Sequence, residues 1–302
     1  MSKLTTVINV PRAPDIDTIL QGWRSWCNQQ PTLIKPLTGG LTNKSYLVES
    51  LGERYVVRVN AANSRALGLQ RDMEARVLMS VSDTSIGSQL VYFDPCECYL
   101  VTRYIDGQHW QLSDSQSHEG INRLASLLKA IHGLEPVEYF LDVAIKADHY
   151  WQHIAGDSEL AQSLRQLKPQ VDHHIAQANK QNRHPVLCHN DLVVENLLLG
   201  NDQKLHALDW EYAAMGDPFF DLAVIVEEHK LNESESLQLL QSYLDGKPSK
   251  QDLNRLYSNQ IIGCYLSVLW YAVKYAAGSE RATHQDCKDR LICLQQLLSA
   301  TL

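Results

Sequence analysis

The sequence predicts an α+β fold of two lobes, a small antiparallel five-stranded lobe with one helix followed by a larger and mainly helical lobe. The chain has 302 residues, about twice the roughly 150 residues of a typical domain. Residues 32–103 contain five short β-rich runs around one helical segment. Beyond Asp106-Gly107 the apolar residues follow helical periodicity. We therefore expect an N-terminal lobe of residues 1–105 and a C-terminal lobe of residues 106–302.

Composition and charge exclude several classes of protein. Hydrophobic residues make up 44% and charged residues 21% of the chain, which excludes a disordered or fibrous chain. The net charge of −8 argues against nucleic acid as a partner, because phosphate contacts need clustered Lys and Arg. The longest uncharged apolar stretch, residues 261–273, is shorter than the roughly 20 residues of a membrane-spanning helix. We expect it to form a buried helix and we expect no membrane insertion.

Two further features concern the compartment. The first thirty residues do not have the pattern of a secretory signal. The seven cysteines are odd in number and irregularly spaced, which favours free thiols in a reducing environment. We therefore expect a cytoplasmic protein, and the sequence leaves its oligomeric state open.

The elements of the first lobe follow from alternating β-rich runs and turn residues. The predicted strands are residues 33–37, 44–48, 55–59, 88–93 and 99–103. Between the third and fourth strands, Ser64 is a predicted helix N-cap. Leu69, Met73 and Val77 then recur every four residues, which predicts a helix that ends near Ser80.

The second lobe is helical except for one segment. Helical periodicity covers residues 121–131, 160–178, 222–226 and 261–275. In the exception, residues 186–214, two apolar β-like runs at 185–188 and 205–208 bracket a polar loop and a strand at 196–199. Catalytic residues are often found in loops of this kind, positioned by the neighbouring strands.

This segment contains the residues that point to chemistry. His189, Asp191 and Asn196 lie in one loop, and Asp209 follows thirteen residues later. Phosphoryl transfer needs such a set: one carboxylate to orient and deprotonate a hydroxyl, and an amide oxygen with a second carboxylate to hold Mg²⁺. The spacing His-x-Asp-x-x-x-x-Asn, followed by a strand and Asp, matches the catalytic and metal loops of protein-kinase-like folds.

Residues upstream occur in the order that such a fold requires. Gly39-Gly40 forms a turn, Arg58 lies on the third strand, and Glu74 lies on the helix. In protein kinases these positions hold a glycine-rich loop, a basic residue on the phosphates and an acid that pairs with it. Arg58 replaces the usual Lys and keeps its charge, and the loop lacks the full three-glycine pattern.

The chain resembles the aminoglycoside phosphotransferase and choline kinase family of small-molecule kinases, in particular the bacterial choline, ethanolamine and thiamine kinases. The segments that carry the resemblance are His189-Asn190-Asp191 with Asn196, Leu208-Asp209-Trp210-Glu211-Tyr212-Ala213, and Gly216-Asp217-Pro218 with Phe220-Asp221-Leu222-Ala223. Similar segments upstream are Gly39-Gly40-Leu41-Thr42-Asn43, Val56-Val57-Arg58-Val59 and residues 102–107. The resemblance covers roughly residues 32–275 and implies a two-lobed, protein-kinase-like fold with ATP and Mg²⁺ as cofactors.

The resemblance also implies roles for individual residues. Asp191 would be the catalytic base, and Asn196 and Asp209 the Mg²⁺ ligands. His189 would support the loop. The residues expected at the nucleotide are Gly39, Gly40, Asn43, Arg58, Glu74, Thr102, Arg103 and Ile105. Among them, the backbone of residues 103–105 would be the hinge that binds adenine, with Thr102 behind it.

The expected substrate is a small cationic alcohol. Trp270 and Tyr271 belong to an aromatic set on the helix at 261–275, and aromatic faces attract organic cations. Glu211, beside Asp209, adds negative potential, and residues 106–302 carry a net charge of −10. Choline or ethanolamine is the first choice, thiamine follows, and an aminoglycoside is third. The alternative for the helix is a core helix with aromatic filler.

The sequence also bears on two other functions. A nucleotide-binding module without catalysis would need a defect outside Asp191, Asn196 and Asp209, and the incomplete glycine loop is the one candidate for it. A protein kinase is disfavoured because no Ala-Pro-Glu segment follows Asp209. Asp217 and Asp221 precede or begin an apolar helix, which favours capping and loop-fixing roles.

Overall fold

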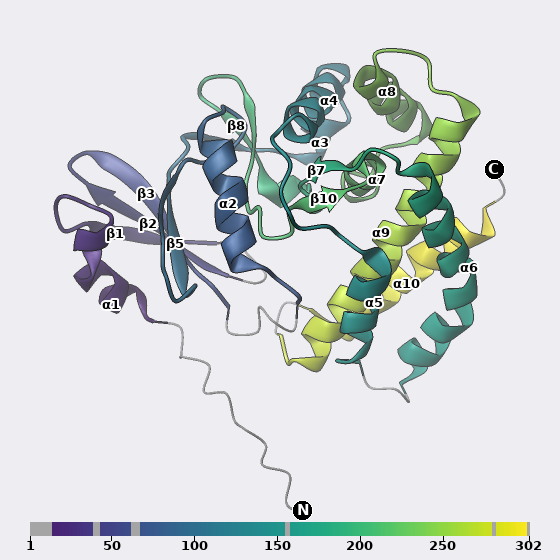
Figure 1. Ribbon diagram of the computed structural model, residues 1–302, viewed down its shortest axis with the longest axis horizontal. Coiled ribbons are helices and arrows are strands. Elements are labelled where there is room, and N and C mark those ends of the chain that lie inside the picture. Colours follow the sequence, from purple (N-terminus) through teal and green to yellow (C-terminus); the bar gives the residue numbers. More distant parts are fainter. Residues whose placement is uncertain (1–13, 39–42, 62–66, 155–157, 280–281, 301–302) are drawn as a thin grey trace, which may run out of the picture. The chain divides into compact units, whose positions relative to one another are not determined.

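The computed structural model describes residues 14–38, 43–61, 67–154, 158–279 and 282–300 (Figure 1). The chain divides into two compact units. The described parts of residues 1–65 and 90–104 form the smaller unit, and those of residues 66–89 and 105–302 form the larger one. Helix α2 (Arg71–Ser82) therefore groups with the larger unit. The lobe boundary between residues 105 and 106 stays a prediction from the sequence.

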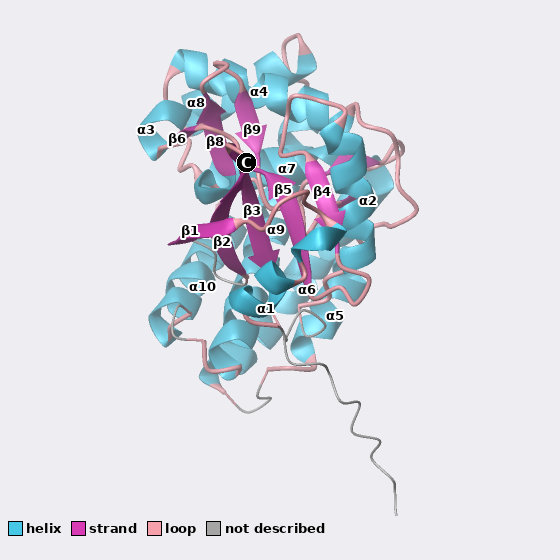
Figure 2. Cartoon of the chain, turned by 90° about the vertical axis from the view of Figure 1, so that its left-hand side faces the viewer, coloured by secondary structure: helices cyan, strands magenta, loops and turns pink. Residues whose placement is uncertain are grey.

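The smaller unit is built on one antiparallel sheet (Figure 2). Its strands are β1 (Thr32–Leu37), β2 (Lys44–Ser50), β3 (Glu53–Val59), β4 (Leu90–Phe93) and β5 (Tyr99–Arg103), in the order β1-β2-β3-β5-β4. This arrangement confirms the predicted five-stranded sheet. Pro36 lies on edge strand β1, where a residue without a backbone N–H is tolerated.

A short helical segment packs on this sheet. It consists of α1 (Ile16–Gln21), with Asp15 as its N-cap, and the 3₁₀ turn η1 (Trp23–Ser25). Ile19, Leu20 and Trp26 are buried with apolar residues of β2, β3 and β5. The core of the smaller unit is therefore made by one face of the sheet and this segment.

Helix α2 starts later than the sequence predicts. The predicted N-cap Ser64 lies outside the described residues, while the helix begins at Arg71 after Gln70. Gln70 makes no side-chain cap hydrogen bond, so no capping residue marks this start in the sequence. Leu69, expected on the helix face, precedes the helix and lies in the hydrophobic core of the larger unit. The helix exists as predicted, but its predicted N-terminal part was wrong.

Helices make up most of the larger unit. They are α2, α3 (Leu112–Ser115), α4 (His118–His132), α5 (Val143–Trp151), α6 (Glu159–Gln181), α7 (Pro218–Glu228), α8 (Glu233–Leu244), α9 (Lys250–Ala276) and α10 (His284–Ser299). The long helix α9 packs against α5, α6, α7 and α10 (Figure 1). Every residue from Ile261 to Val273 is buried or half-buried, as the buried-helix prediction requires. In the part of the chain that is described, no helix combines the length and apolar character needed to span a bilayer.

Short strands in the larger unit frame the segment singled out by the sequence. They are β6 (Gly107–His109), β7 (Val186–Cys188), β8 (Leu197–Gly200), β9 (Leu205–Ala207) and β10 (Ala214–Gly216), with the 3₁₀ turn η2 (Val194–Asn196) before β8. They form a sheet in the order β6-β8-β9 and a pair of β7 with β10. Strands β7, β8 and β9 confirm the prediction. The sequence did not predict β6 and β10, which contain a glycine each and no β-branched residue, whereas the equally short β7 and β9 lie in apolar runs.

Candidate active site

The loop between β7 and β8 carries the predicted catalytic residues. Asn190 adopts a positive φ of 63°, a conformation that Asn tolerates better than most residues. Its amide Nδ2 donates a hydrogen bond to the carbonyl oxygen of Tyr212 at 3.0 Å. This bond ties the loop to the segment that contains Asp209 and Glu211.

Asp191 and Asn196 are brought together within this loop. The Nδ2 of Asn196 donates to the Oδ2 of Asp191 at 2.8 Å and to its backbone oxygen at 2.9 Å. Asn196 ends the 3₁₀ turn η2, where its backbone N–H donates to the carbonyl oxygen of Val193 at 3.0 Å. The carboxylate proposed as the base is therefore oriented by an amide of the proposed metal site.

Asp221 of α7 holds the start of the loop. Its two carboxylate oxygens accept the backbone N–H groups of His189 at 2.8 Å and Asn190 at 2.7 Å. The Nε2 of His132 lies 3.1 Å from the same carboxylate, and the Nδ1 of His132 lies 2.8 Å from the hydroxyl oxygen of Tyr243. Asp221 is fully buried, so these bonds replace its hydration and support the predicted loop-fixing role.

Asp217 has the predicted helix-capping role. It is the N-cap of α7 and accepts the backbone N–H of Phe219 at 2.9 Å. It also forms an ion pair with Arg255 at 2.6 Å. Asp217 thus fixes the helix that presents Asp221.

A second buried chain of hydrogen bonds supports the residue after Asp191. The Nε2 of His229 donates to the carbonyl oxygen of Leu192 at 2.8 Å, and its Nδ1 lies 2.6 Å from the hydroxyl of Ser115. The indole of Trp110 donates to the same hydroxyl at 2.7 Å. Burial lowers the pKa of His229, which keeps the ring neutral and able to bridge these partners.

The segment after β9 is tied to the loop through Leu208. The backbone N–H of Leu208 donates to the carbonyl oxygen of Asn196 at 2.8 Å, and the Nε2 of His189 donates to the carbonyl oxygen of Leu208 at 3.0 Å. His189 is fully buried, and burial lowers its pKa. These contacts agree with the predicted supporting role of His189. Asp209 follows with a positive φ of 59°.

The pKa of Asp191 is shifted by its burial and by neighbouring acidic side chains. Burial raises its pKa well above the ordinary value, and the nearby carboxylates of Asp209 and Glu211 raise it further. The hydrogen bond from Asn196 acts in the opposite direction. Three acidic side chains that are separated in the sequence therefore share one electrostatic environment.

Such an environment fits a divalent cation. Like charges at close range disfavour one another's ionisation, and a cation among them removes that cost. Carboxylate and amide oxygens are the ligands that Mg²⁺ prefers. The donor set of Asp209, Asn196 and the nearby Asp191 thus has the right chemistry for magnesium, and the roles of Asn196 and Asp209 as ligands remain predictions.

Glu211 has a buried partner that the sequence analysis did not single out. The Nη1 of Arg71 lies 2.7 Å from the Oε2 of Glu211 and 3.1 Å from the Oε2 of Glu74. All three residues are buried. The spacing of Arg71 and Glu74 on α2 could have indicated their pairing, but nothing in the sequence connects them to Glu211.

Arg58 and Glu74 belong to different units. Arg58 is buried on β3, and its Nη2 donates to the Oδ1 of Asn60 at 3.2 Å. Its predicted pairing with Glu74 and its contact with phosphates remain predictions.

The other residues predicted at the nucleotide lie in several places. Gly39 and Gly40 lie outside the described residues. Asn43 is buried at the start of β2, and its Oδ1 accepts the backbone N–H of Ala61 at 3.2 Å. Asn43 therefore joins two segments of the smaller unit.

The predicted hinge begins on β5. Thr102 is buried, and Arg103 pairs with Glu53 while its guanidinium lies 4.9 Å from the ring centroid of Tyr55. Ile105 is half-buried and has no regular secondary structure. The adenine-binding role of this segment remains a prediction.

The predicted aromatic residues of α9 already contact cations of the chain itself. The Nζ of Lys274 lies 5.4 Å from the ring centroid of Trp270, and the guanidinium of Arg290 lies 5.3 Å from that of Tyr271. The indole of Trp270 also donates to the hydroxyl of Tyr212 at 2.7 Å. Trp270 is thus connected to the Asp-Trp-Glu-Tyr-Ala segment, while packing against the core as the alternative interpretation expected.

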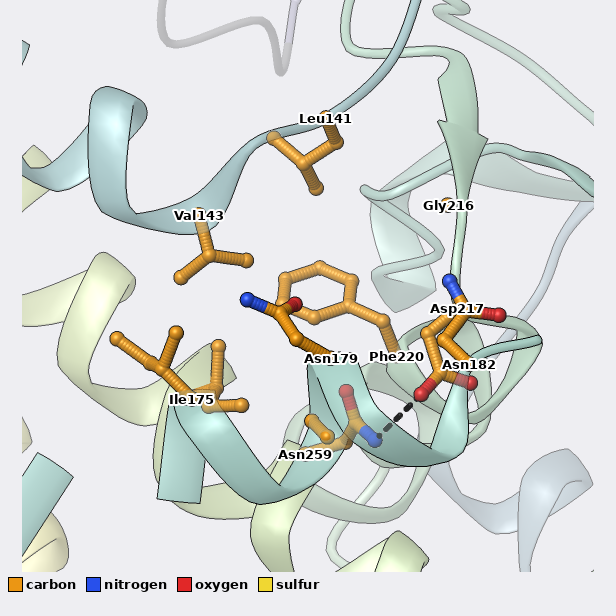
Figure 3. Close-up of a pocket in the computed structure, with 11 residues that line it drawn as sticks. Leu141, Val143, Ile175, Asn179, Asn182, Gly216, Asp217, Phe220 and Asn259 are labelled. Atoms are coloured by element: carbon orange, nitrogen blue, oxygen red, sulfur yellow. Dashed lines mark hydrogen bonds between the residues drawn. The ribbon is translucent and has the colours of Figure 1, made fainter. Parts of the chain in front are cut away.

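A separate pocket lies among α6, α7 and α9 (Figure 3). It is lined by Leu141, Val143, Ile175, Ala178, Asn179, Asn182, Gly216, Asp217, Phe220, Asn259 and Ile262. Figure 3 shows the amide of Asn259 directed at the carboxylate of Asp217, a hydrogen bond of 3.3 Å. None of the predicted site residues lines this pocket.

Solved structures of other proteins share this fold. Choline kinase LicA from Streptococcus pneumoniae superposes with a TM-score of 0.74 at 19% identity, covering 94% of this chain and 99% of that one. LicA in complex with AMP gives a TM-score of 0.75 at 20% identity, covering 94% and 97% of the two chains. These similarities confirm the predicted two-lobed, protein-kinase-like fold class.

The sequence itself is similar to curated relatives. Protein LicA of Haemophilus influenzae is 29% identical over 253 residues, which cover 80% of this chain and 73% of the relative. The model of the APH family, described as the phosphotransferase enzyme family, matches residues 33–256. The match includes Asp191, Asn196, Asp209 and Glu211. It confirms the prediction of a phosphotransferase, and the chain belongs to the phosphotransferase enzyme family.

Proposed function

We propose that this phosphotransferase transfers the γ-phosphoryl group of ATP, with Mg²⁺, to the hydroxyl of a small cationic alcohol. Choline or ethanolamine is the first candidate and thiamine the second. One observation carries the proposal: the Asp191 carboxylate is held by Asn196 and shares its electrostatic environment with Asp209 and Glu211.

In the proposed reaction Asp191 acts as general base. Its carboxylate takes the proton from the substrate hydroxyl while that oxygen attacks the γ-phosphorus. The bond from the γ-phosphorus to the bridging oxygen breaks, and ADP leaves with that oxygen. The hydrogen bond from Asn196 keeps the carboxylate in one orientation through this step.

Asn196 and Asp209 would hold the metal ion. When bound, Mg²⁺ neutralises the developing charge on the phosphate oxygens. The AMP complex of LicA supports adenine nucleotide as the phosphoryl donor. The residues of the smaller unit that the sequence predicts at the nucleotide, with Arg58 on the phosphates, would bind this donor.

Two features support a cationic acceptor. The Streptococcus pneumoniae relative in the fold comparison is a choline kinase. In this chain Glu211 contributes negative charge beside aromatic side chains, since Tyr212 follows it and binds the indole of Trp270. Aromatic faces near a carboxylate favour an organic ammonium group.

The test is a substrate panel with the purified chain. ATP consumption and phosphorylated product are measured by ³¹P NMR with choline, ethanolamine, thiamine and kanamycin, each with Mg²⁺. We expect turnover of choline or ethanolamine, and loss of turnover by about 10²–10⁴-fold in Asp191→Asn. The matched control is Asp172→Asn, which changes an exposed aspartate of α6 paired with Lys168.

The outcomes separate the alternatives. Phosphorylation of kanamycin alone would assign the chain to aminoglycosides and reject the cationic small alcohol. Nucleotide binding without turnover of any acceptor would indicate a non-catalytic module. Undiminished turnover in Asp191→Asn would reject Asp191 as the base.

A further inference from the structure

Lys146 of α5 has surroundings that are typical of a receptor for an organic ammonium ion. Its Nζ lies 2.6 Å from the carbonyl oxygen of Leu67 and 3.3 Å from that of Gly68. It also lies 5.2 Å from the ring centroid of Tyr150 and 5.0 Å from that of Tyr212. Two carbonyl acceptors and two aromatic faces within about 6 Å form a cage for a cation.

The backbone at Gly68 is adapted to this close approach. Gly68 has a φ of +63°, which other residues adopt with strain. A Cβ added there would lie 3.1 Å from the Nζ of Lys146. A side chain at this position would therefore crowd the ammonium group.

The cage lies in the electrostatic environment of the candidate active site. Burial raises the pKa of Tyr150, and the carboxylates of Asp191 and Glu211 raise it further. The same two carboxylates act on Tyr212, whose pKa is also raised, mainly by burial. Glu211 also acts on Lys146 itself. The cage therefore lies within the influence of Glu211, and its two tyrosines are within the influence of Asp191 as well.

We propose that Lys146 is a tethered cation that occupies the ammonium position of the acceptor site, and that a cationic acceptor binds there by displacing it. This inference rests on the proposed function, because it assigns the cage to the acceptor of that reaction. Lys146 then determines specificity, since an acceptor must compete with a cation that the chain supplies itself.

The charge state of Lys146 controls this competition. Burial lowers its pKa to about 8, while Glu211 opposes the shift. Ionisable groups near it are Tyr150 and His149 on α5 and Tyr212 beside Glu211. Lys274 of α9 also interacts with Glu211. Lys146 is therefore mostly charged at pH 7 and mostly neutral at pH 9, and the neutral amine competes poorly for aromatic faces.

Tetramethylammonium is the probe of choice, because its charge does not titrate and its binding needs no turnover. Its dissociation constant is measured by calorimetry at pH 7 and pH 9 with the full chain. Lys146 has a pKa of about 8, and its charged form blocks the cage. Since the neutral fraction of Lys146 rises about tenfold from pH 7 to pH 9, the apparent dissociation constant of the probe should fall about tenfold. Lys146→Met, which removes the charge and keeps the length, should bind about tenfold tighter than the unchanged chain at pH 7 and show no such pH dependence.

Two variants serve as controls. Lys168→Met removes an exposed lysine that pairs with Asp172 and should behave like the unchanged chain. Lys146→Arg keeps a cation in the cage and should bind the probe weakly at both pH values.

The measurements discriminate between this inference and the proposed function. If choline is phosphorylated but the probe binds equally at pH 7 and pH 9, the tethered-cation inference fails while the proposed function stands. If Lys146→Met binds the probe more weakly than the unchanged chain, the inference fails as well, because Lys146 then supports the site. If no cationic alcohol is phosphorylated but the probe shows the expected pH dependence, the cage assignment stands and the proposed function fails. The pH dependence of the unchanged chain keeps the test valid even if a Lys146 variant does not fold.

Discussion

The Nδ2 group of Asn196 donates hydrogen bonds to both the carboxylate and the backbone oxygen of Asp191, at 2.8 and 2.9 Å. An amide that donates through its nitrogen keeps its oxygen for another ligand. One residue thus orients the proposed base and retains an oxygen of the kind that Mg²⁺ prefers.

Asn196→Ala is expected to slow turnover and to shift its pH dependence. The hydrogen bond from Asn196 lowers the pKa of Asp191, so its loss raises that pKa further. Because the base acts when ionised, the acid side of the profile of kcat/KM against pH should move to higher pH. The measurement is that profile at saturating Mg²⁺ for both proteins, and an unshifted acid side would contradict the role of this bond.

Asp191→Asn is expected to stabilise the fold while it abolishes turnover. The folded-state pKa of Asp191 is raised above its ordinary value, so its stabilising contribution is fully present below that ordinary pKa and is lost as the pH rises through the folded value. At pH 7 the neutral amide removes the cost of the ionised carboxylate, and Tm should rise by a few degrees in the absence of Mg²⁺. Thermal denaturation followed by circular dichroism tests this, with Asp172→Asn as the control that leaves Tm unchanged.

Arg71→Met is expected to destabilise the larger unit strongly. It leaves Glu74 and Glu211 buried without this shared partner, and breaking a buried ion pair costs about 3–5 kcal/mol. Urea denaturation gives the free energy of unfolding, and adding Glu211→Gln should recover part of the loss. The control Arg123→Met breaks a pair with the exposed Glu119 and should cost less than about 1 kcal/mol. Equal losses of unfolding free energy in the two variants would mean that the buried triad stabilises the fold no more than an exposed ion pair does.

His229→Gln is expected to reduce the sensitivity of the fold to acid. Burial lowers the pKa of His229 below its ordinary value of 6.5. The unfolded chain therefore binds the proton first, and stability that is complete above this value falls as the pH drops toward the folded pKa. The slope is about 1.4 kcal/mol per pH unit for each proton taken up. Unfolding free energies at pH 7.5, 6.0 and 5.0 should fall less steeply in the variant, and equal slopes would assign the acid sensitivity to other groups such as the buried His189.

The sequence by itself determined the elements and the short-range chemistry of this protein. Strand runs such as 44–48 and 55–59 are rich in β-forming residues and are separated by a turn, and the spacing from His189 to Asn196 lies within one loop. Where local patterns were weak, prediction failed. The start of α2 has no side-chain cap, and β6 and β10 contain a glycine each and no β-branched residue.

Tertiary structure alone decided which distant residues meet. Arg71 reaches Glu211 across 140 positions, and Lys146 enters a cage made by Gly68 and Tyr212. It also decided that Trp270 and Tyr271, which the sequence predicts at the substrate, contact cationic side chains of the chain itself. The physical reason is that periodicity and spacing reflect the backbone conformation of a few consecutive residues. Ion pairs and cation–π contacts between remote side chains depend on how the helices pack, and no local pattern records that.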